Sequence, residues 1–168
     1  TESKFHSLLL RMGVESEYEG CYFATLQLIR FVKSIQPDIV HLHCLNNSCV
    51  NIYKFLRFLA KSHTKTIITH HAEFYYTGSC THAFECLEFT KNPGCVHCPR
   101  PIKSCRTRIF PNPSKQWRKM FDAFSTFPVG SLAFVAVSPW VQKRTIMSEI
   151  LNKHPSFVIL NGVDTSIF

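Results

Sequence analysis

No hydrophobic run in the chain approaches the roughly 20 residues that a membrane-spanning helix needs. The first residues, Thr1 to Lys4, include neither an initiator methionine nor the layout of a signal peptide, so we expect the chain to be part of a longer protein. The sequence also lacks internal repeats and low-complexity segments, and hydrophobic residues make up 45% of its 168 positions. This composition excludes disordered and collagen-like proteins and predicts a single domain with its own core.

Acidic side chains are scarce, because 11 of them face 19 lysines and arginines and leave a net charge of +8. Such a charge favours anionic partners, including nucleic acid, phosphorylated metabolites and an anionic lipid surface. One basic run is interleaved with prolines and Trp117, and it consists of Lys103, Arg106, Arg108, Lys115, Arg118 and Lys119. This run predicts contact with a phosphate backbone or with anionic lipid, and a merely solvated face remains the alternative.

Short apolar runs alternate with amphipathic segments along the chain. We expect strands at 39–43, 66–69, 132–137 and 157–160, and helices at 22–35, 50–62, 115–124 and 140–150. The first of these helices is expected to bury the apolar side chains from Phe23 to Ile35. The alternation predicts an α/β fold, a Rossmann-like parallel sheet with helices on both faces.

Polar side chains follow each expected strand. They are His43 and Cys44 after the first strand, His70 and His71 after the second, Ser138 after the third, and Asn161 and Gly162 after the fourth. Ligands of parallel sheets bind at the carboxyl ends of the strands, so these residues mark a candidate site. His71 and the nearby Glu73 are candidates for contact with a polar ligand. His41 is instead expected to be an imidazole in the core or directly behind the site, with one hydrogen bond to the backbone.

The segment 72–113 has no periodicity and contains five of the eight cysteines. Cys80, Cys86 and the CxxC pair of Cys95 and Cys98 predict a closed tetrahedral zinc site that would order the loop. Disulfides and unligated thiols remain alternatives, and substitute ligands are available in His82, His97 and Cys105. Four sulfur ligands leave no position for water, so no catalytic metal is expected. The scattered Cys21, Cys44 and Cys49 are expected to be buried thiols.

Four further strings occur in a fixed order, namely "PDIVHLHCLNNSCVNI", "TGSC" with the later "CVHCP", "VSPW" and "NGVDTSIF". Together they resemble the acceptor-side domain of GT-B glycosyltransferases of family 4. The similarity is greatest to a bacterial subgroup in polysaccharide assembly, whose cysteine loop runs from TGHC to CxxCP. The resemblance implies that 1–168 is part of an N-terminal acceptor-side Rossmann-like domain, with 72–113 as its cysteine-rich loop. It also implies that a donor-binding domain follows residue 168.

The resemblance implies roles for individual residues. His71 matches a catalytic strand-end histidine that faces the cleft near the transferred sugar. Cys80, Cys86, Cys95 and Cys98 match the family's loop cysteines, so a zinc ion held there would be structural. The expected substrate-binding residues are His43, Glu73, Thr77, Gly78, Ser138, Asn161 and Gly162. Trp140 and Asp164 match further motif positions.

Three positions depart from the family pattern. Ala72 stands where the family has an acidic residue, Cys44 replaces the asparagine of HLHN, and Ser79 replaces the histidine of TGHC. Each change removes a polar group from the expected cleft. Because the family's first strand precedes Thr1 and its donor domain follows Phe168, the resemblance implies that this chain alone is inactive.

The expected function is therefore transfer of a hexose from a nucleoside diphosphate sugar to a saccharide or lipid-linked acceptor, in surface polysaccharide assembly. The expected location is the cytoplasm, peripheral to the inner face of the membrane. The alternative is a zinc-stabilised module that binds nucleic acid or an anionic surface. The parallel sheet argues against nucleic acid, because common zinc modules are small and contain no such sheet.

Overall fold

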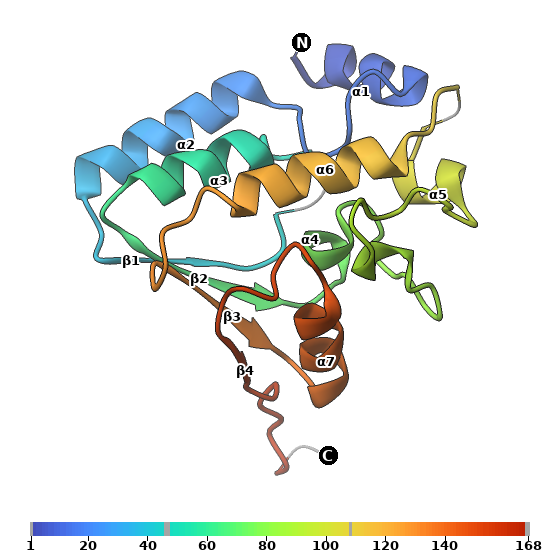
Figure 1. Ribbon diagram of the computed structural model, residues 1–168. Helices are drawn as coiled ribbons and strands as arrows, with labels where there is room; N and C mark the ends of the chain where they lie inside the picture. The colour runs from blue at the N-terminus through green and yellow to red at the C-terminus, as the bar shows by residue number, and fades with distance from the viewer. Residues whose placement is uncertain (1, 46–47, 108, 167–168) are drawn as a thin grey trace.

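The computed structural model describes residues 2–45, 48–107 and 109–166, so Arg108 of the basic run and Phe168 lie outside the described residues. The elements in chain order are α1 (Glu2–Met12), α2 (Tyr22–Ile35), β1 (Ile39–Leu42), α3 (Ile52–Lys61), β2 (Lys65–His70), α4 (Phe74–Thr77), the 3-10 helix η1 (Glu88–Thr90), α5 (Pro101–Cys105), α6 (Pro113–Phe124), β3 (Leu132–Ala136), α7 (Pro139–Met147) and β4 (Ser156–Val158). Figure 1 shows their arrangement.

The four strands form one parallel sheet in the order β1-β2-β3-β4. Each connection moves the chain one position in the same direction, and right-handed crossovers then place the connecting helices on the same face. The Rossmann-like α/β class predicted from the sequence is confirmed. Figure 1 shows α2, α3 and α6 stacked over the sheet, with α7 beside β3 and β4.

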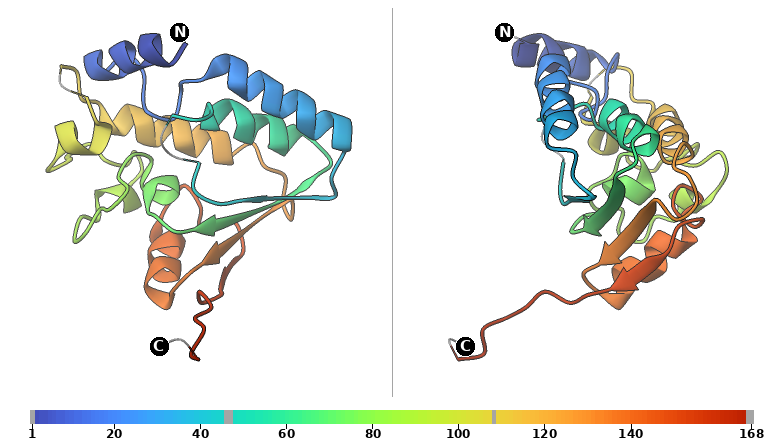
Figure 2. Two further views of the ribbon diagram at one scale, coloured as in Figure 1. Left: turned by 180° about the vertical axis from the view of Figure 1, so that it is seen from behind. Right: turned by 90° about the vertical axis from the view of Figure 1, so that its left-hand side faces the viewer.

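The structure differs from the prediction in which faces of the sheet the helices cover. His70 of β2 contacts Thr145 of α7, and Phe134 of β3 packs on Phe124 of α6, so α6 and α7 lie on one face of the sheet. Within the described residues no helix lies on the opposite face (Figure 2), where Ile39 and Phe157 are exposed. The prediction of helices on both faces is therefore wrong for this part of the chain.

The amphipathic helices bury their apolar faces to different extents. In α3, Ile52, Phe55, Leu56 and Leu59 are all buried, as the 3.6-residue period predicts. In α2, by contrast, only Thr25 and Val32 are buried, and Phe23 and Ile35 are exposed. The expected buried face of α2 is confirmed at Val32 and in part at Ile29, and it is wrong at the two ends of the helix. This helix lies at the outside of the layer and packs mainly on α3.

Trp117 of α6 anchors the long segment between β2 and β3. Its side chain is fully buried, and its indole nitrogen donates a hydrogen bond to the carbonyl oxygen of Phe89, 3.0 Å away. Two glycines permit the chain to approach this residue. A Cβ atom on Gly78 would lie 2.5 Å from the Cα atom of Trp117, and one on Gly94 would lie 2.3 Å from the indole nitrogen.

Gly78→Ala tests this close approach. Gly78 has φ +80°, and its neighbour is backbone that cannot rotate away, so strain and overlap should together lower the free energy of unfolding by at least about 2 kcal/mol. The matched control is Gly130→Ala, where φ is +75° and nothing lies within 4 Å of the added Cβ atom. Urea denaturation should show a loss of only about 1 kcal/mol for the control. Equal losses in the two variants would contradict the packing argument.

Candidate active site

Three imidazole rings gather at the carboxyl ends of β1 and β2. Nδ1 of His43 lies 3.0 Å from Nε2 of His71, and the two rings are stacked with their centroids 5.2 Å apart. The ring of His41 follows at 4.4 Å from that of His43, and its Nε2 lies 2.8 Å from the Thr69 hydroxyl. We call these three residues the histidine cluster.

The parallel register brings the cluster together. His41 pairs with Ile67, so the chain positions two residues later, His43 and Thr69, also lie side by side. The Tyr75 hydroxyl donates to the carbonyl oxygen of His43 over 2.9 Å and fixes the end of β1. All three histidines are exposed, so His41 is not a core residue. Its ring lies beside that of His43, and its hydrogen bond is to the Thr69 side chain and not, as expected, to the backbone.

The neighbouring rings of the cluster affect the pKa of His41. Partial burial and the neighbouring His43 and His71 lower the pKa of His41. The hydrogen bond between His43 and His71 needs one donor nitrogen and one acceptor nitrogen, so at least one of these two rings is neutral when the bond forms. The cluster therefore presents hydrogen-bonding nitrogens to a ligand without a concentrated positive charge.

Three other predicted binding residues follow the strands β3 and β4. Because His70 pairs with Ala136, Ser138 follows β3 at the same edge of the sheet as His71. The Ser138 hydroxyl accepts a hydrogen bond from the Val141 amide over 3.3 Å and caps α7. Asn161 and Gly162 are exposed and follow β4, the strand at the opposite edge of the sheet from β1.

Thr77 and Gly78 do not join the cluster. Thr77 is buried, and its hydroxyl donates to the carbonyl oxygen of Cys80 over 2.8 Å. Gly78 ends α4 against the backbone of Trp117. Local packing accounts for Thr77 and Gly78 at these positions, and the structure gives no support for substrate contact by either residue.

Glu73 is also held by contacts within the protein. It is only 3% exposed, and both of its carboxylate oxygens are used within the protein. Oε1 accepts from Nε of Arg144 at 2.7 Å and from the Tyr76 hydroxyl at 3.1 Å, and Oε2 accepts from the Ala83 amide at 2.6 Å. A carboxylate held in this way has a structural role in the described chain, and substrate binding by Glu73 stays a prediction.

Arg144 completes a buried ion pair that joins three parts of the chain. Its guanidinium donates to the carbonyl oxygen of Cys86 over 3.2 Å and lies 4.8 Å from the Phe89 ring. The pair thus links α4, the cysteine loop and α7. Sequence reasoning missed Arg144 because an arginine in an amphipathic helix is ordinarily turned toward solvent.

Arg144→Met should leave the buried carboxylate of Glu73 without its counter-charge and lower the free energy of unfolding by about 3 kcal/mol or more. Arg144→Lys should fall between this variant and the parent, because an ammonium group cannot reproduce both guanidinium contacts. The control is Lys143→Met on the same helix, whose side chain is exposed, and it should leave the urea midpoint nearly unchanged. An Arg144→Met variant as stable as the control would show that the pair is unimportant.

The predicted zinc ligands lie close to one another in the loop. Burial, together with the neighbouring thiols of Cys98 and Cys86, raises the pKa of Cys80 to about 11. Burial also raises the pKa of Cys95, with contributions from the same three thiols. All four cysteines have free thiols, so the disulfide alternative is not formed in the structure.

The proximity of these four thiols does not by itself make a metal-binding site. In the described part of the chain, no group of three or more His, Cys, Asp or Glu side chains is arranged to hold a metal ion. Bound zinc would require these thiols to draw together and to lose their protons, so structural zinc stays a prediction. The three scattered cysteines were predicted wrongly as buried, because Cys44 and Cys49 are exposed and Cys21 is half-buried.

The basic run is dispersed by the fold. Lys119 forms an ion pair with Glu19, and Arg106 forms one with Glu17, with 2.8 Å between Nη1 and Oε2. Trp117 is fully buried, so it cannot stack on a nucleic-acid base. This placement removes the aromatic support for a nucleic-acid interface.

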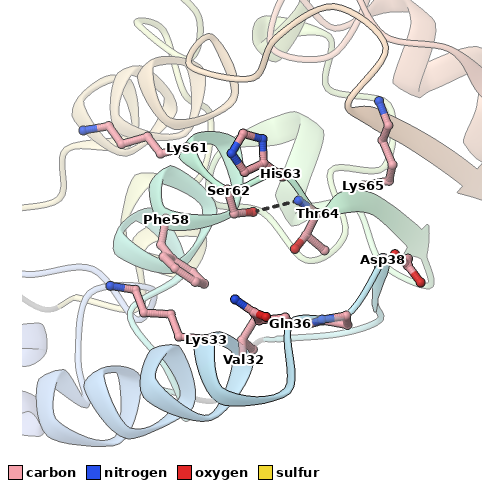
Figure 3. A pocket seen from close by; sticks show the side chains of 11 residues that line it. Val32, Lys33, Gln36, Asp38, Phe58, Lys61, Ser62, His63, Thr64 and Lys65 are labelled. Atoms are coloured by element: carbon pink, nitrogen blue, oxygen red, sulfur yellow. Dashed lines mark hydrogen bonds between the residues drawn. The ribbon is translucent and has the colours of Figure 1, made fainter.

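A large cavity lies at the other end of the sheet. It has a volume of about 940 Å³ and is formed where α2 and α3 end and where β1 and β2 begin. Figure 3 shows Phe58 and Gln36 at this cavity, with Lys33 and Lys61 at its rim. Both lysines lie in the last turn of a helix, where a positive charge complements the helix dipole. Ligands of parallel sheets bind at the opposite ends of the strands, so we place the candidate site at the histidine cluster.

None of the described helices is long and apolar enough to cross a bilayer.

Comparison with known proteins identifies the family of the chain. The family model of Glycosyltransferase Family 4 matches residues 10–167, nearly the whole chain. No curated protein and no solved structure matches the chain. The parallel α/β sheet, with polar side chains at its carboxyl edge, is typical of domains that bind ligands at that edge. The chain belongs to glycosyltransferase family 4 and carries a domain for glycosyl transfer.

Proposed function

We propose that the chain is the acceptor-side half of a GT-B enzyme that moves a hexose from a nucleoside diphosphate sugar to a saccharide or lipid-linked acceptor. The observation that carries this proposal is the histidine cluster, three hydrogen-bonding rings at the carboxyl edge of a family 4 domain. The proposal places the enzyme in surface polysaccharide assembly, in the cytoplasm at the inner face of the membrane. A donor-binding domain would complete the cleft.

Within this proposal His71 is the catalytic residue. Its ring is exposed at the end of β2, and the stacked His43 ring holds it through the bond between Nδ1 and Nε2. Glycosyl transfer needs the departing phosphate and the positive sugar carbon to be stabilised at fixed positions. A ring positioned by a neighbour can donate to, or accept from, a sugar hydroxyl without reorganising during the reaction. His43 therefore acts as a positioning residue.

His71→Ala in the native-length enzyme should lower kcat by roughly 100-fold, because transfer depends on a positioned group at the reacting sugar. The measurement is transfer of labelled hexose from a panel of nucleoside diphosphate sugars to a lipid-linked saccharide. The control is His63→Ala, an exposed histidine at the opposite end of the sheet, which should retain full activity. Unchanged turnover in His71→Ala, with an unchanged melting temperature, would remove His71 from the site.

The cysteine loop supports a second part of the proposal, a structural zinc ion held by Cys80, Cys86, Cys95 and Cys98. Support comes from the neighbouring thiols, which add to the effect of burial in raising the pKa values of Cys80 and Cys95. Such an ion would tie the loop to α4 and would take no part in the chemistry of transfer, because four thiolates leave no open position.

Metal analysis of protein purified under reducing conditions should find close to one zinc per chain. Because the Cys80 thiol has a pKa of about 11, zinc must displace protons, so apparent affinity should rise with pH and protons should be released on binding. Cys95→Ser should lose the metal, whereas Cys49→Ser, outside the loop, should keep it. Metal-free protein with an intact fold and no response to added zinc would refute the site.

A further inference from the structure

A small pocket on the cysteine loop is lined by positive charge. Its volume is about 240 Å³, below the roughly 300–1,000 Å³ of sites for drug-sized ligands, so it suits a single chemical group. The lining includes the side chains of Arg100, Lys103, Arg106 and His82. Among the described residues no aspartate or glutamate lines it. A concave site with this lining attracts anions.

Two segments of the loop build the pocket and hold it together. Residues 79–84 supply one wall and residues 100–106 supply the other. The Arg100 guanidinium joins the walls, because Nη2 donates to the carbonyl oxygen of Ala83 over 3.1 Å and the group lies 4.8 Å from the Phe84 ring. A guanidinium has five N–H donors, so most of them remain available to a ligand.

The other cationic side chains of the pocket differ in how far a neighbouring carboxylate neutralises their charge. Arg106 shares its charge with the buried carboxylate of Glu17, 2.8 Å from Nη1. Lys103 is exposed on α5. Ser79 also lines the pocket and is 3% exposed, and its hydroxyl makes no hydrogen bond in the described structure beyond its contact with the Cys80 thiol. This hydroxyl can donate to an anion.

We propose that this pocket binds a phosphate group through Arg100, Lys103 and Arg106. Planar guanidinium groups match the oxygens of phosphate by paired hydrogen bonds, and phosphate carries up to two negative charges at neutral pH. The loop lies on the side toward which the strand arrows of Figure 1 point, the same side as the histidine cluster. The inference depends on the charge of the pocket and not on glycosyl transfer.

The test uses the full chain and inorganic phosphate as the probe. Two-dimensional NMR should show saturable amide shifts confined to residues 79–84 and 100–106, which weaken as salt is added. Lys103→Gln should bind phosphate about fivefold more weakly. Lys61→Gln makes the same charge change at the opposite end of the sheet and should bind like the parent.

A second arm identifies the source of the phosphate. Vesicles of phosphatidylcholine are compared with vesicles that also contain phosphatidic acid, whose head group is a phosphomonoester. Sedimentation with phosphatidic acid that Lys103→Gln reduces, and that free phosphate competes away, assigns the site to a lipid-borne phosphate. Phosphate binding without such sedimentation assigns it to a soluble phosphate compound.

Three outcomes would overturn the inference. The first is an absence of saturable shifts at millimolar phosphate, and the second is shifts scattered over the whole surface. The third is an equal loss of binding in Lys103→Gln and Lys61→Gln, which would reduce the effect to the net charge of the chain. Because Lys103 is exposed, its variant should fold like the parent, and the NMR spectrum itself checks this.

Discussion

The buried ion pair of Glu73 and Arg144 is the constraint on which the rest of the structure depends. Removing two charges from water costs several kcal/mol for each ion, and this cost is offset only when further hydrogen bonds satisfy both groups. Here the carboxylate also accepts from Ala83 and Tyr76, and the guanidinium also donates to Cys86. A pair satisfied in this way has one geometry, so it sets where the loop leaves β2 and how α7 lies against it.

The histidine cluster and the phosphate pocket both depend on the position of the segments that this ion pair joins, but they are built differently. The cluster stands on strand ends that the parallel register aligns, whereas the pocket stands on a loop that has little regular structure of its own. Rigid placement of the loop matters, because binding groups held in advance lose less conformational freedom when a ligand arrives. Trp117 and the two glycines that approach it supply that rigidity on the side away from α7.

Much of the fold could be predicted from the sequence, and parts of the site could not. Periodicity identified α3 and its buried face, because apolar spacing reports burial directly. It failed for α2, where the exposure of Phe23 and Ile35 depends on which elements lie next to the helix. The prediction that residues after the strands share one edge of the sheet was correct for His43 and His71, which contact each other. The motif residues Glu73, Thr77 and Gly78 were assigned to ligand contact, because a motif does not distinguish a packing role from a binding role.

The one-sided helix cover has a consequence for how the chain behaves among copies of itself. The bare face exposes Ile39 and Phe157, and β1, at the end of the sheet order, leaves backbone groups on its outer side that another strand could pair with. Such a surface favours self-association, and the net charge of +8 opposes it by mutual repulsion. Because salt screens repulsion between surface charges more than it weakens apolar contact, colloidal stability should be greatest at low ionic strength.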